Sequence, residues 1–536
     1  MPEGKITLKY WGYVTMDRMD MTLTLESAVA LLNQHHLLRE VIDGNVWTTD
    51  SAELPQRTFS DISYDTRKVS AETLLFCKGR FSPEYLQSAN ELGLSCYVAQ
   101  EDFSEYTDAT GIIVRNATQA MSLLSAAFYD FPQHDLTVIG ITGTKGKTTT
   151  AYFTQAILNA YSGGKTALFS SVDNCLDGVH YEESDLTTPE SMDLFRMMHQ
   201  ARSNGMTYLV MEVSSQAYKV DRVYGLHFDI GAFLNITPDH ISSIEHPTFE
   251  DYLFCKRQII ANSSRMIIGA DSQHLSLLRE DAEREHVPVS TFALRDSTND
   301  MQDADIVSVS NEHTRPAFGL YENGKDIGSF TLSIEGDFNE ANAAAATALA
   351  LSAGVPVDDP SLHAMESIRI SGRMERFTSE DGVIAYVDYA HNYASIKALV
   401  DFVYQRYGSR HPRITLVTGS AGNKAIDRRE GIVKAAQDRI ARFIFTTEDT
   451  DTEPNSEICA QLMGYVTNPA VEAGVILDRT QAIEEAYRDA QAHADRLNVL
   501  LVTGKGEERW IKDLNRHVPF EGDSNIVARL FRKVAK

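Results

Sequence analysis

The stretch Gly143–Thr149 reads Gly-Thr-Lys-Gly-Lys-Thr-Thr and carries the residue types of a phosphate-binding loop. It follows an apolar run, Leu136–Ile141, that is typical of a buried parallel strand, and it precedes Thr150–Leu158, whose apolar residues recur at helical spacing. A strand, a glycine-rich turn and a helix direct backbone N–H groups at an anion. In such a loop Lys147 reaches the outer phosphates and the Thr148 hydroxyl binds Mg²⁺. The spacing predicts a nucleoside-triphosphate site, although isoleucine stands where the first glycine of the standard loop belongs.

Polar side chains follow two further predicted strands, Tyr208–Val213 and Ile230–Leu234. Glu212 belongs to the first strand end, and Asn235, Asp239 and His240 follow the second. A carboxylate and an imidazole at neighbouring parallel-strand ends could hold Mg²⁺ beside the phosphates. Taken singly, each is more often a capping or turn residue. Their combination with the glycine-rich loop favours a metal site.

These residues must be positioned by a chain of 536 residues, which predicts about three domains. Residues 1–20 are interpreted as an extension before the first domain. Residues 21–135 combine helix with short strands such as Ile62–Val69, whereas residues 136–372 and 373–536 repeat strand–helix units. Repeated units of this kind predict mostly parallel sheets, with ligands at the carboxyl ends of the strands.

Composition excludes several function classes. A net charge of −26 repels nucleic acid and anionic membranes, so neither is expected as a partner. No apolar stretch approaches the ~20 residues of a membrane span. The five cysteines are scattered without a C-x-x-C pair, which argues against a disulfide framework or a zinc site and fits a reducing cytoplasm. We therefore expect a cytoplasmic monomer that acts on small molecules.

Six motifs, in order along the chain, resemble the Mur ligases, the ATP-dependent amide-forming enzymes that build the peptide stem of peptidoglycan. The likeness extends from Asp65 to Gly506, nearly the whole chain. It implies a small uridine-binding α/β domain, a central P-loop-type ATPase domain with a parallel sheet, and a Rossmann-like C-terminal α/β domain. The motifs are Gly143–Thr149, Glu212–Ser215, Asn235–His240, Gly336–Asn342, Gly372-Arg373 and Asp388–Asn392.

Within the family, Thr187–Ser191 and Glu212–Ala217 look like the ligases that add a diamino acid to UDP-N-acetylmuramoyl-L-alanyl-D-glutamate. The resemblance implies that Lys147, Glu212, His240 and Lys256 are catalytic. It also implies that CO₂ carbamylates Lys256, which supplies an oxygen ligand for a second Mg²⁺. Without the resemblance, Lys256 reads as a solvated lysine beside its neighbouring arginine. The implied metal ligands are Thr148, Glu212, His240 and the Lys256 carbamate.

The same resemblance implies substrate contacts residue by residue. ATP contacts are expected from Gly143, Thr144, Lys145, Gly146, Lys147, Thr148, Thr149, Asn235, Asn339, Arg373, Asp388, His391 and Lys424. Contacts with the UDP-muramoyl-dipeptide are expected from Thr66, Thr187, Thr188, Ser214 and Arg222. Lys424 replaces the arginine that is more usual in the family, so a forked phosphate contact becomes a point charge.

The added amino acid is predicted from one loop. Relatives that add meso-diaminopimelate use a D-N-P-R motif, whose arginine holds the second carboxylate. The matching stretch here is Glu448–Asp451, which has three acids and no arginine. Acids suit a terminal ammonium, so we expect Glu448, Asp449, Asp451 and Glu508 to bind L-lysine, with L-ornithine next and meso-diaminopimelate a further alternative. The competing interpretation is that the acids cap a helix that starts near Pro454.

The implied reaction forms an acyl phosphate on the D-glutamyl carboxylate, which an amine then attacks. Folylpolyglutamate synthetase shares this chemistry but lacks a uridine-binding first domain. A non-catalytic Mur-like subunit also lacks that domain and carries a cysteine cluster. A generic P-loop switch or transport ATPase would need no carbamylated lysine. Phosphate release with and without the UDP-dipeptide discriminates among these functions.

Overall fold

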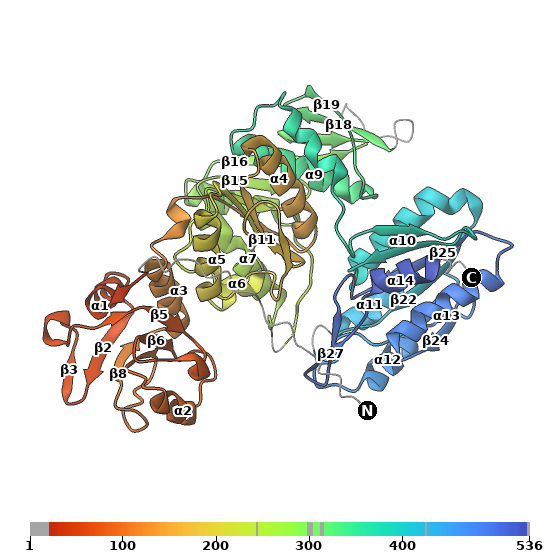
Figure 1. Ribbon diagram of the computed structural model, residues 1–536. Coiled ribbons are helices and arrows are strands. Elements are labelled where there is room, and N and C mark those ends of the chain that lie inside the picture. Colours follow the sequence, from red (N-terminus) through yellow and green to blue (C-terminus); the bar gives the residue numbers. More distant parts are fainter. Residues whose placement is uncertain (1–20, 243–244, 297–303, 311–315, 424–425, 533–536) are drawn as a thin grey trace, which may run out of the picture. The chain divides into compact units, whose positions relative to one another are not determined.

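The computed structural model describes residues 21–242, 245–296, 304–310, 316–423 and 426–532. The predicted extension of residues 1–20 lies outside this part of the chain. The described residues divide into two compact units (Figure 1). The first contains the chain up to His134 together with Pro189–Gln200 and Val220–Gly225, and the second contains the remainder.

The first unit is built on a mixed sheet with the strand order β3-β2-β8-β7-β6-β5. Strand β2 runs antiparallel to both its neighbours, and the strands from β8 to β5 are parallel. The strands are β2 (Leu38–Asp43), β3 (Val46–Thr48), β5 (Asp61–Ser63), β6 (Thr73–Phe76), β7 (Cys96–Ala99) and β8 (Thr110–Val114), and β1 (Leu23–Thr24) pairs with β4 (Thr58–Phe59). The helices are α1 (Leu25–Gln34), α2 (Leu86–Glu91), α3 (Ala117–Phe128) and the part of α5 (Ser191–Ser203) up to Gln200.

The predicted strand Ile62–Val69 is wrong beyond its first residues. Strand β5 ends at Ser63, and the Asp65 carboxylate accepts a hydrogen bond from the Arg67 backbone N–H at 3.0 Å. This local bond caps a short 3₁₀ turn, Thr66–Lys68. A side chain that bonds its own backbone two residues on offers the chain an alternative to a strand ladder.

The second unit contains a large sheet with the order β12-β11-β10-β13-β9-β14-β15-β16-β17-β18-β19. Strands β10 to β17 are parallel, and antiparallel pairs extend both edges. The strands are β9 (Thr137–Thr142), β10 (Thr166–Phe169), β11 (Asp173–Cys175), β12 (Tyr181–Glu183), β13 (Tyr208–Glu212), β14 (Ile230–Phe233), β15 (Met266–Gly269), β16 (Val289–Arg295), β17 (Ile306–Val309), β18 (Ala317–Glu322) and β19 (Lys325–Thr331). The helices are α4 (Lys147–Ser162), α6 (Ser215–Lys219), α7 (Phe249–Ala261), α8 (Leu275–Arg284) and α9 (Asp337–Ser352).

Strand β9 is the topological switch point of this sheet. It is the first strand of the sheet in the sequence, yet it lies between β13 and β14. The chain therefore leaves neighbouring strands in opposite directions, which opens a crevice at their carboxyl ends. Val138, Ile139 and Ile141 of β9 are fully buried, as expected for a central strand covered on both faces. The loop Gly143–Gly146 and helix α4 follow β9 directly at this crevice.

The C-terminal part of the second unit has its own sheet, with the order β20-β21-β25-β22-β23-β24. All neighbours are parallel except β20 and β21. Helices α10 to α12 belong to one hydrophobic cluster and α13 and α14 to another, and successive residues of the strands alternate between the two clusters. The strands of this sheet are β20 (Glu375–Thr378), β21 (Ile384–Asp388), β22 (Arg413–Thr418), β23 (Arg442–Phe445), β24 (Glu472–Val475) and β25 (Asn498–Thr503). A separate antiparallel pair consists of β26 (Trp510–Asp513) and β27 (Arg516–Pro519). The helices are α10 (Tyr393–Tyr407), α11 (Asp427–Ala436), α12 (Asn455–Gly464), α13 (Arg479–Ala492) and α14 (Asp523–Phe531).

The parallel sheets agree with the predicted α/β class. Each of the five cysteines is a buried free thiol. Among the described residues, none of the helices combines the length and apolar character that crossing a membrane requires.

Candidate active site

The glycine-rich loop has a backbone that only glycine adopts easily. Gly143 has a φ of 155° and Gly146 has a φ of 84°, which lie in the region that disfavours residues with a Cβ. A Cβ on Gly146 would also lie 2.3 Å from Oδ1 of Asn342. Helix α4 begins at Lys147, immediately after the loop. The loop and the first turn of α4 therefore present an anion-binding helix N-terminus.

Asn235, predicted to contact ATP, holds the loop in place. Its side-chain Oδ1 accepts from the Lys145 backbone N–H at 2.9 Å, and its Nδ2 donates to the Lys145 carbonyl at 3.0 Å. Its own backbone carbonyl accepts from the Thr144 N–H at 3.0 Å. The end of β14 is thus tied to the loop that follows β9, so Asn235 positions the phosphate loop.

Two lysines converge on one carbonyl of the loop. Lys147 Nζ lies 3.0 Å from the Gly143 oxygen, and Lys256 Nζ lies 2.9 Å from the same atom. Lys256 comes from α7 and is 2% exposed. Burial, followed by the nearby Lys147 charge, holds the pKa of Lys256 well below its usual range. Burial also lowers the pKa of Lys147.

Glu212 lies at the end of β13 and is 1% exposed. Its Oε1 accepts from the backbone N–H of Ser171 at 2.8 Å. The Ser171 hydroxyl lies 3.1 Å from the Thr148 hydroxyl, and Arg373 Nη2 lies 3.4 Å from both hydroxyl oxygens. These contacts connect Glu212, Thr148 and Arg373, which the sequence assigns to metal and ATP binding.

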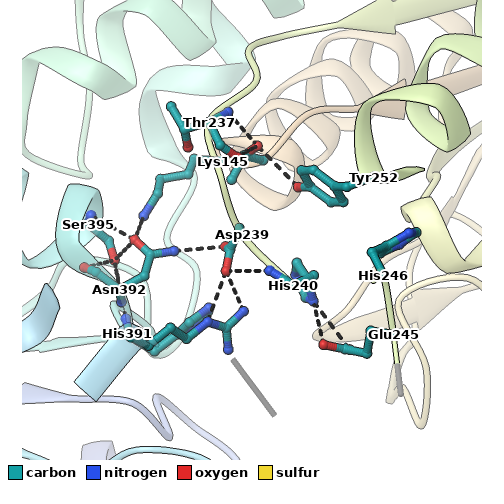
Figure 2. Close-up of polar contacts among 12 residues, drawn as sticks. Lys145, Thr237, Asp239, His240, Glu245, His246, Tyr252, His391, Asn392 and Ser395 are labelled. Carbon is teal, nitrogen blue, oxygen red and sulfur yellow. Dashed lines mark hydrogen bonds and ion pairs between the residues drawn. The ribbon is translucent and has the colours of Figure 1, made fainter. Parts of the chain in front are cut away.

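Asp239, at the end of the segment that follows β14, connects several side chains of the site (Figure 2). It is 5% exposed and accepts two hydrogen bonds from Arg428, at 2.9 Å and 2.5 Å. It also accepts from Asn392 Nδ2 at 2.8 Å, and Lys145 Nζ donates to Asn392 Oδ1. Asn392 in turn caps α10 by accepting from the Ser395 N–H. Burial lowers the pKa of Lys145 to about 7.

His240, predicted to bind Mg²⁺, has a left-handed backbone with a φ of 57°. Its N–H donates to Asp239 Oδ1 at 3.0 Å, and its Nδ1 lies 3.3 Å from both carboxylate oxygens of Glu245. Its ring stacks on the Tyr252 ring, with 5.8 Å between the ring centroids. Figure 2 labels both residues. A left-handed backbone is uncommon in a residue other than glycine and marks a constrained turn.

The remaining predicted ATP contacts also make local bonds. Asn339 Nδ2 donates to the Glu335 carbonyl at 2.8 Å. Asp388 accepts from the backbone N–H groups of Met374 and Ala390, both at 2.8 Å, while burial raises its pKa. His391 Nδ1 lies 2.8 Å from the Tyr389 carbonyl, and burial holds its pKa well below the usual range. Lys424 lies outside the described residues.

The residues predicted to bind the UDP-dipeptide lie in both units. In the second unit the Thr188 hydroxyl donates to the Glu212 carbonyl at 3.0 Å and accepts from the Ser214 N–H at 3.0 Å. Thr187, its neighbour in the sequence, is half-buried. In the first unit Thr66 opens the 3₁₀ turn, and Arg222 Nη2 lies 2.7 Å from Glu190. Lys78 donates to the same carboxylate.

The acids predicted to read the amino acid have different surroundings. Lys505 forms ion pairs with Asp449, at 2.9 Å, and with Glu508. Lys512 forms one with Asp451 at 3.3 Å. Glu448 is 7% exposed, its Oε2 has no hydrogen-bond partner, and burial raises its pKa to about 7. Pro454, the N-cap residue of helix α12, makes no side-chain capping bond, and the structure pairs Asp449 and Asp451 with lysines.

The residues at the crevice suit a triphosphate and Mg²⁺. Lys145 and Lys147 are half-buried lysines whose pKa values are lowered by desolvation, so an anion bound beside the loop would favour their charged forms. The Thr148 hydroxyl and the Glu212 carboxylate are hard oxygen donors of the kind that Mg²⁺ prefers. Sequence reasoning placed Asp239 among the polar residues that follow the second strand. It gave no role to Arg428, Asn392 or Tyr252, which the structure brings to the same place.

Comparison with known proteins decides the family. The model of the Mur ligase middle domain matches residues 141–350, and that of the Mur ligase glutamate ligase domain matches residues 372–506. The chain is 62% identical over 515 residues to a UDP-N-acetylmuramyl-tripeptide synthetase of Bifidobacterium longum (strain NCC 2705), covering 95% of this chain and 100% of that protein. The chain belongs to the Mur ligase family. The predicted family, fold class and ligase activity are therefore confirmed.

Other members and neighbours of the Mur ligase family are more distant. The UDP-N-acetylmuramoyl-L-alanyl-D-glutamate--L-lysine ligase of Enterococcus faecalis (strain ATCC 700802 / V583) is 40% identical over 522 residues, covering 96% of this chain and 100% of that protein. A solved UDP-N-acetylmuramoyl-L-alanyl-D-glutamate--2,6-diaminopimelate ligase aligns with a TM-score of 0.57 and 21% identity, over 88% of this chain and 94% of that one. A Mycobacterium tuberculosis folylpolyglutamate synthase aligns with a TM-score of 0.57 and 16% identity, over 78% of this chain and 96% of that one. At these identities the solved structures show a shared fold.

Proposed function

We propose that this Mur ligase joins L-lysine to the D-glutamyl carboxylate of UDP-N-acetylmuramoyl-L-alanyl-D-glutamate, with hydrolysis of ATP to ADP and phosphate. The observation that carries the proposal is the gathering of the glycine-rich loop, Lys147, Lys256 and Glu212 at the switch point of the large sheet. The names of the Bifidobacterium longum and Enterococcus faecalis relatives support the substrate.

A carboxylate resists attack by an amine because its leaving group would be oxide. The reaction therefore needs a carboxylate oxygen to attack the γ-phosphorus of ATP, which releases ADP and gives an acyl phosphate. The amine nitrogen then attacks the acyl carbon, and the tetrahedral intermediate expels phosphate and loses a proton to give the amide. Most of the catalysis is positioning and neutralisation of charge on the transferred phosphoryl group.

The chain supplies this neutralisation from the loop. Backbone N–H groups at the start of α4 face the phosphates, and Lys147 swings from the Gly143 carbonyl to the transferred group. Mg²⁺, held by Thr148, Glu212 and His240, would withdraw charge from the phosphate oxygens when bound. Arg373, within 3.4 Å of the Thr148 hydroxyl, adds a cation from the C-terminal part of the chain.

The proposed carbamate on Lys256 has a physical basis in the lowered pKa of this lysine. Only a neutral amine attacks CO₂, and burial keeps Lys256 neutral at a pH where an exposed lysine is charged. The new N–C bond forms as the amine loses a proton, and the product is an anion with two oxygen donors. Such an anion beside Lys147 balances the positive charge that gathers around Gly143.

The preference for L-lysine rests on the loop after β23. The diaminopimelate-binding arginine is absent, and Asp451 stands at the matching position with Lys512 beside it. Glu448 is the acid without an intramolecular cation at its Oε2, and a Cβ on Gly504 would lie 2.5 Å from that oxygen. An ammonium group from the amino acid would ionise Glu448 and satisfy this atom. L-ornithine, shorter by one methylene, would lose only about 1–3 kcal/mol of binding.

A competition assay tests the proposal. Purified protein receives ATP, Mg²⁺, the UDP-dipeptide and equal amounts of L-lysine, L-ornithine and meso-diaminopimelate, and mass spectrometry identifies the product. We expect the L-lysine product to predominate, and ADP release to require the UDP-dipeptide. A predominance of the meso-diaminopimelate product would refute the specificity, and ADP release indifferent to the UDP-dipeptide would refute the reaction. We also infer a cytoplasmic location, which the buried free thiols support. We infer a monomer as well, which analytical sedimentation would test.

A further inference from the structure

Three different metal-binding side chains meet at the start of α7. Asp251 and Cys255 are four residues apart on this helix and therefore lie on one face of it. His246 comes from the segment that precedes the helix. One donor atom from each of the three lies within 4.8 Å of the other two. The absence of a C-x-x-C pair argued against zinc in the sequence, but here the donors come from three residue types at other spacings.

The cluster is enclosed yet reachable. His246 has no exposed side-chain surface and Cys255 is 5% exposed, whereas the Asp251 side chain is 31% exposed and gives access from solvent. His246 Nδ1 lies 2.6 Å from Asp251 Oδ2, and its Nε2 lies 2.9 Å from the Ser215 hydroxyl. Nδ1 therefore faces the carboxylate, and the Nε2 contact with Ser215 is the kind of second bond that orients the ring of a metal-binding histidine.

The donor set determines which cations would fit. Sulfur, imidazole nitrogen and one carboxylate oxygen are the ligands of zinc-class ions, whereas Mg²⁺ selects oxygen donors. Tetrahedral bonds to such ligands place the donor atoms about 3.3–3.8 Å apart. The His246–Asp251 contact would lengthen by about 1 Å, a change that rotation of the exposed carboxylate can provide.

One neighbour opposes a cation at this position. Lys219 Nζ lies 2.5 Å from Asp251 Oδ2 and already neutralises the carboxylate. An incoming ion must displace this ammonium, which is itself 30% exposed and can move into water. Gln216 Nε2 at 3.5 Å from His246 Nε2 and the Tyr252 ring at 5.3 Å complete the polar and aromatic surroundings. Loss of the Lys219 charge should therefore strengthen metal binding.

We propose that His246, Asp251 and Cys255 bind one soft divalent ion of the zinc class and that this ion inhibits the enzyme. Cys255 directly precedes Lys256, and the His246 backbone N–H donates to the His240 carbonyl at 3.3 Å. Figure 2 shows His246 and His240 beside the same Tyr252 ring. An ion that draws Cys255 and His246 together shifts both neighbours, Lys256 and His240. Inhibition rests on the proposed ligase activity, whereas binding does not.

Titration of the metal-free full chain with Co²⁺ tests the site directly. We expect one equivalent to bind with a thiolate-to-cobalt charge-transfer band in the near ultraviolet, to be displaced by Zn²⁺, and to persist in excess Mg²⁺. The band should disappear in Cys255→Ser and remain in the matched variant Cys459→Ser, whose buried thiol lies on α12. Lys219→Met should bind Co²⁺ severalfold more tightly. A wild-type chain without the band, or a band unchanged in Cys255→Ser, would overturn the site.

The activity arm separates this site from the ligase reaction. Zn²⁺ should inhibit UDP-tripeptide formation at saturating Mg²⁺ in the wild type and much less in Cys255→Ser. Equal inhibition of both proteins would overturn the inhibitory role. A cobalt band in a protein that never forms the tripeptide would support the metal site and refute the proposed function. Tripeptide formation by a protein without a cobalt band would support the proposed function and refute the metal site.

Discussion

Arg428 donates two hydrogen bonds, from Nε at 2.9 Å and from Nη2 at 2.5 Å, to a single oxygen of Asp239. The two residues are 189 positions apart, and Asp239 directly precedes the predicted metal ligand His240. Burial is the largest single influence and would raise the pKa of Asp239, but the charge and hydrogen bonds of Arg428, together with the nearby His240 and His391, outweigh it and hold that pKa well below the usual range. The pair joins the segment after β14 to the segment around α11, so that His240 is fixed by the C-terminal part of the chain.

Replacing only one partner of this ion pair should impair the enzyme more than replacing both partners with uncharged residues. Arg428→Ala leaves an uncompensated buried carboxylate, which costs about 3–5 kcal/mol. We expect Arg428→Ala to lower both the thermal midpoint and kcat, and Asp239→Asn combined with Arg428→Met to recover part of the midpoint. Because the pKa of Asp239 is depressed, its stabilising charge is lost only as the pH falls well below 4. A double variant less stable than Arg428→Ala would contradict this account.

Lys147 and Glu212 should be needed for phosphoryl transfer. Lys147→Ala removes the cation beside the loop, and Glu212→Gln removes the buried carboxylate from the metal site. Loss of one such electrostatic group lowers kcat by about 10²–10³-fold. The measurement is ADP formation in the presence of the UDP-dipeptide and L-lysine, at several Mg²⁺ concentrations. Lys165→Ala, at an exposed lysine after α4, is the matched control and should keep the wild-type rate.

Lys256→Ala should be nearly inactive and should regain activity with a short carboxylic acid that replaces the carbamate. Lys434→Ala, which replaces an exposed lysine, is the control and should be active without added carboxylic acid. Native mass spectrometry should find the mass of one CO₂ on the wild type and none on Lys256→Ala. Full activity of Lys256→Ala would disprove the carbamate.

Glu448 should make stability depend on pH. Burial raises its pKa from 4.5 to about 7, so the folded protein retains a proton that the unfolded chain loses. The stability that this residue contributes is fully present below pH 4.5. It falls as the pH rises from 4.5 to about 7 and is constant at higher pH. The full loss is about 3 kcal/mol.

The comparison variant is Glu448→Gln, whose side chain does not titrate. Its thermal midpoint relative to the wild type should rise between pH 5 and about pH 7.5, because only the wild type ionises a buried group there. Adding L-lysine should raise the wild-type midpoint more at the higher pH, since an ammonium pairs with the ionised carboxylate. A difference between the two proteins that is constant with pH would show that Glu448 titrates normally.

The sequence by itself determined the phosphate loop and the strands that carry it. An apolar run before Gly143 and a helical period after it are local signals, and the positive φ angles at Gly143 and Gly146 need glycine wherever the loop lies. The strands at Tyr208 and Ile230 were predictable for the same reason, because central parallel strands are apolar along their whole length. Where a local side chain competes with the ladder, as Asp65 does, the periodic pattern fails.

Only the tertiary structure decided which charges face each other. The partners Asp239 and Arg428 come from segments brought together by sheet order and docking, which no local pattern encodes. Sequence gives four acids near the amino-acid loop, but folding pairs three of them with Lys505 and Lys512 and leaves Oε2 of Glu448 without a partner. The His246–Asp251–Cys255 cluster exists for the same reason. Burial and long-range contact, which set the pKa of each group, are properties of the packed chain.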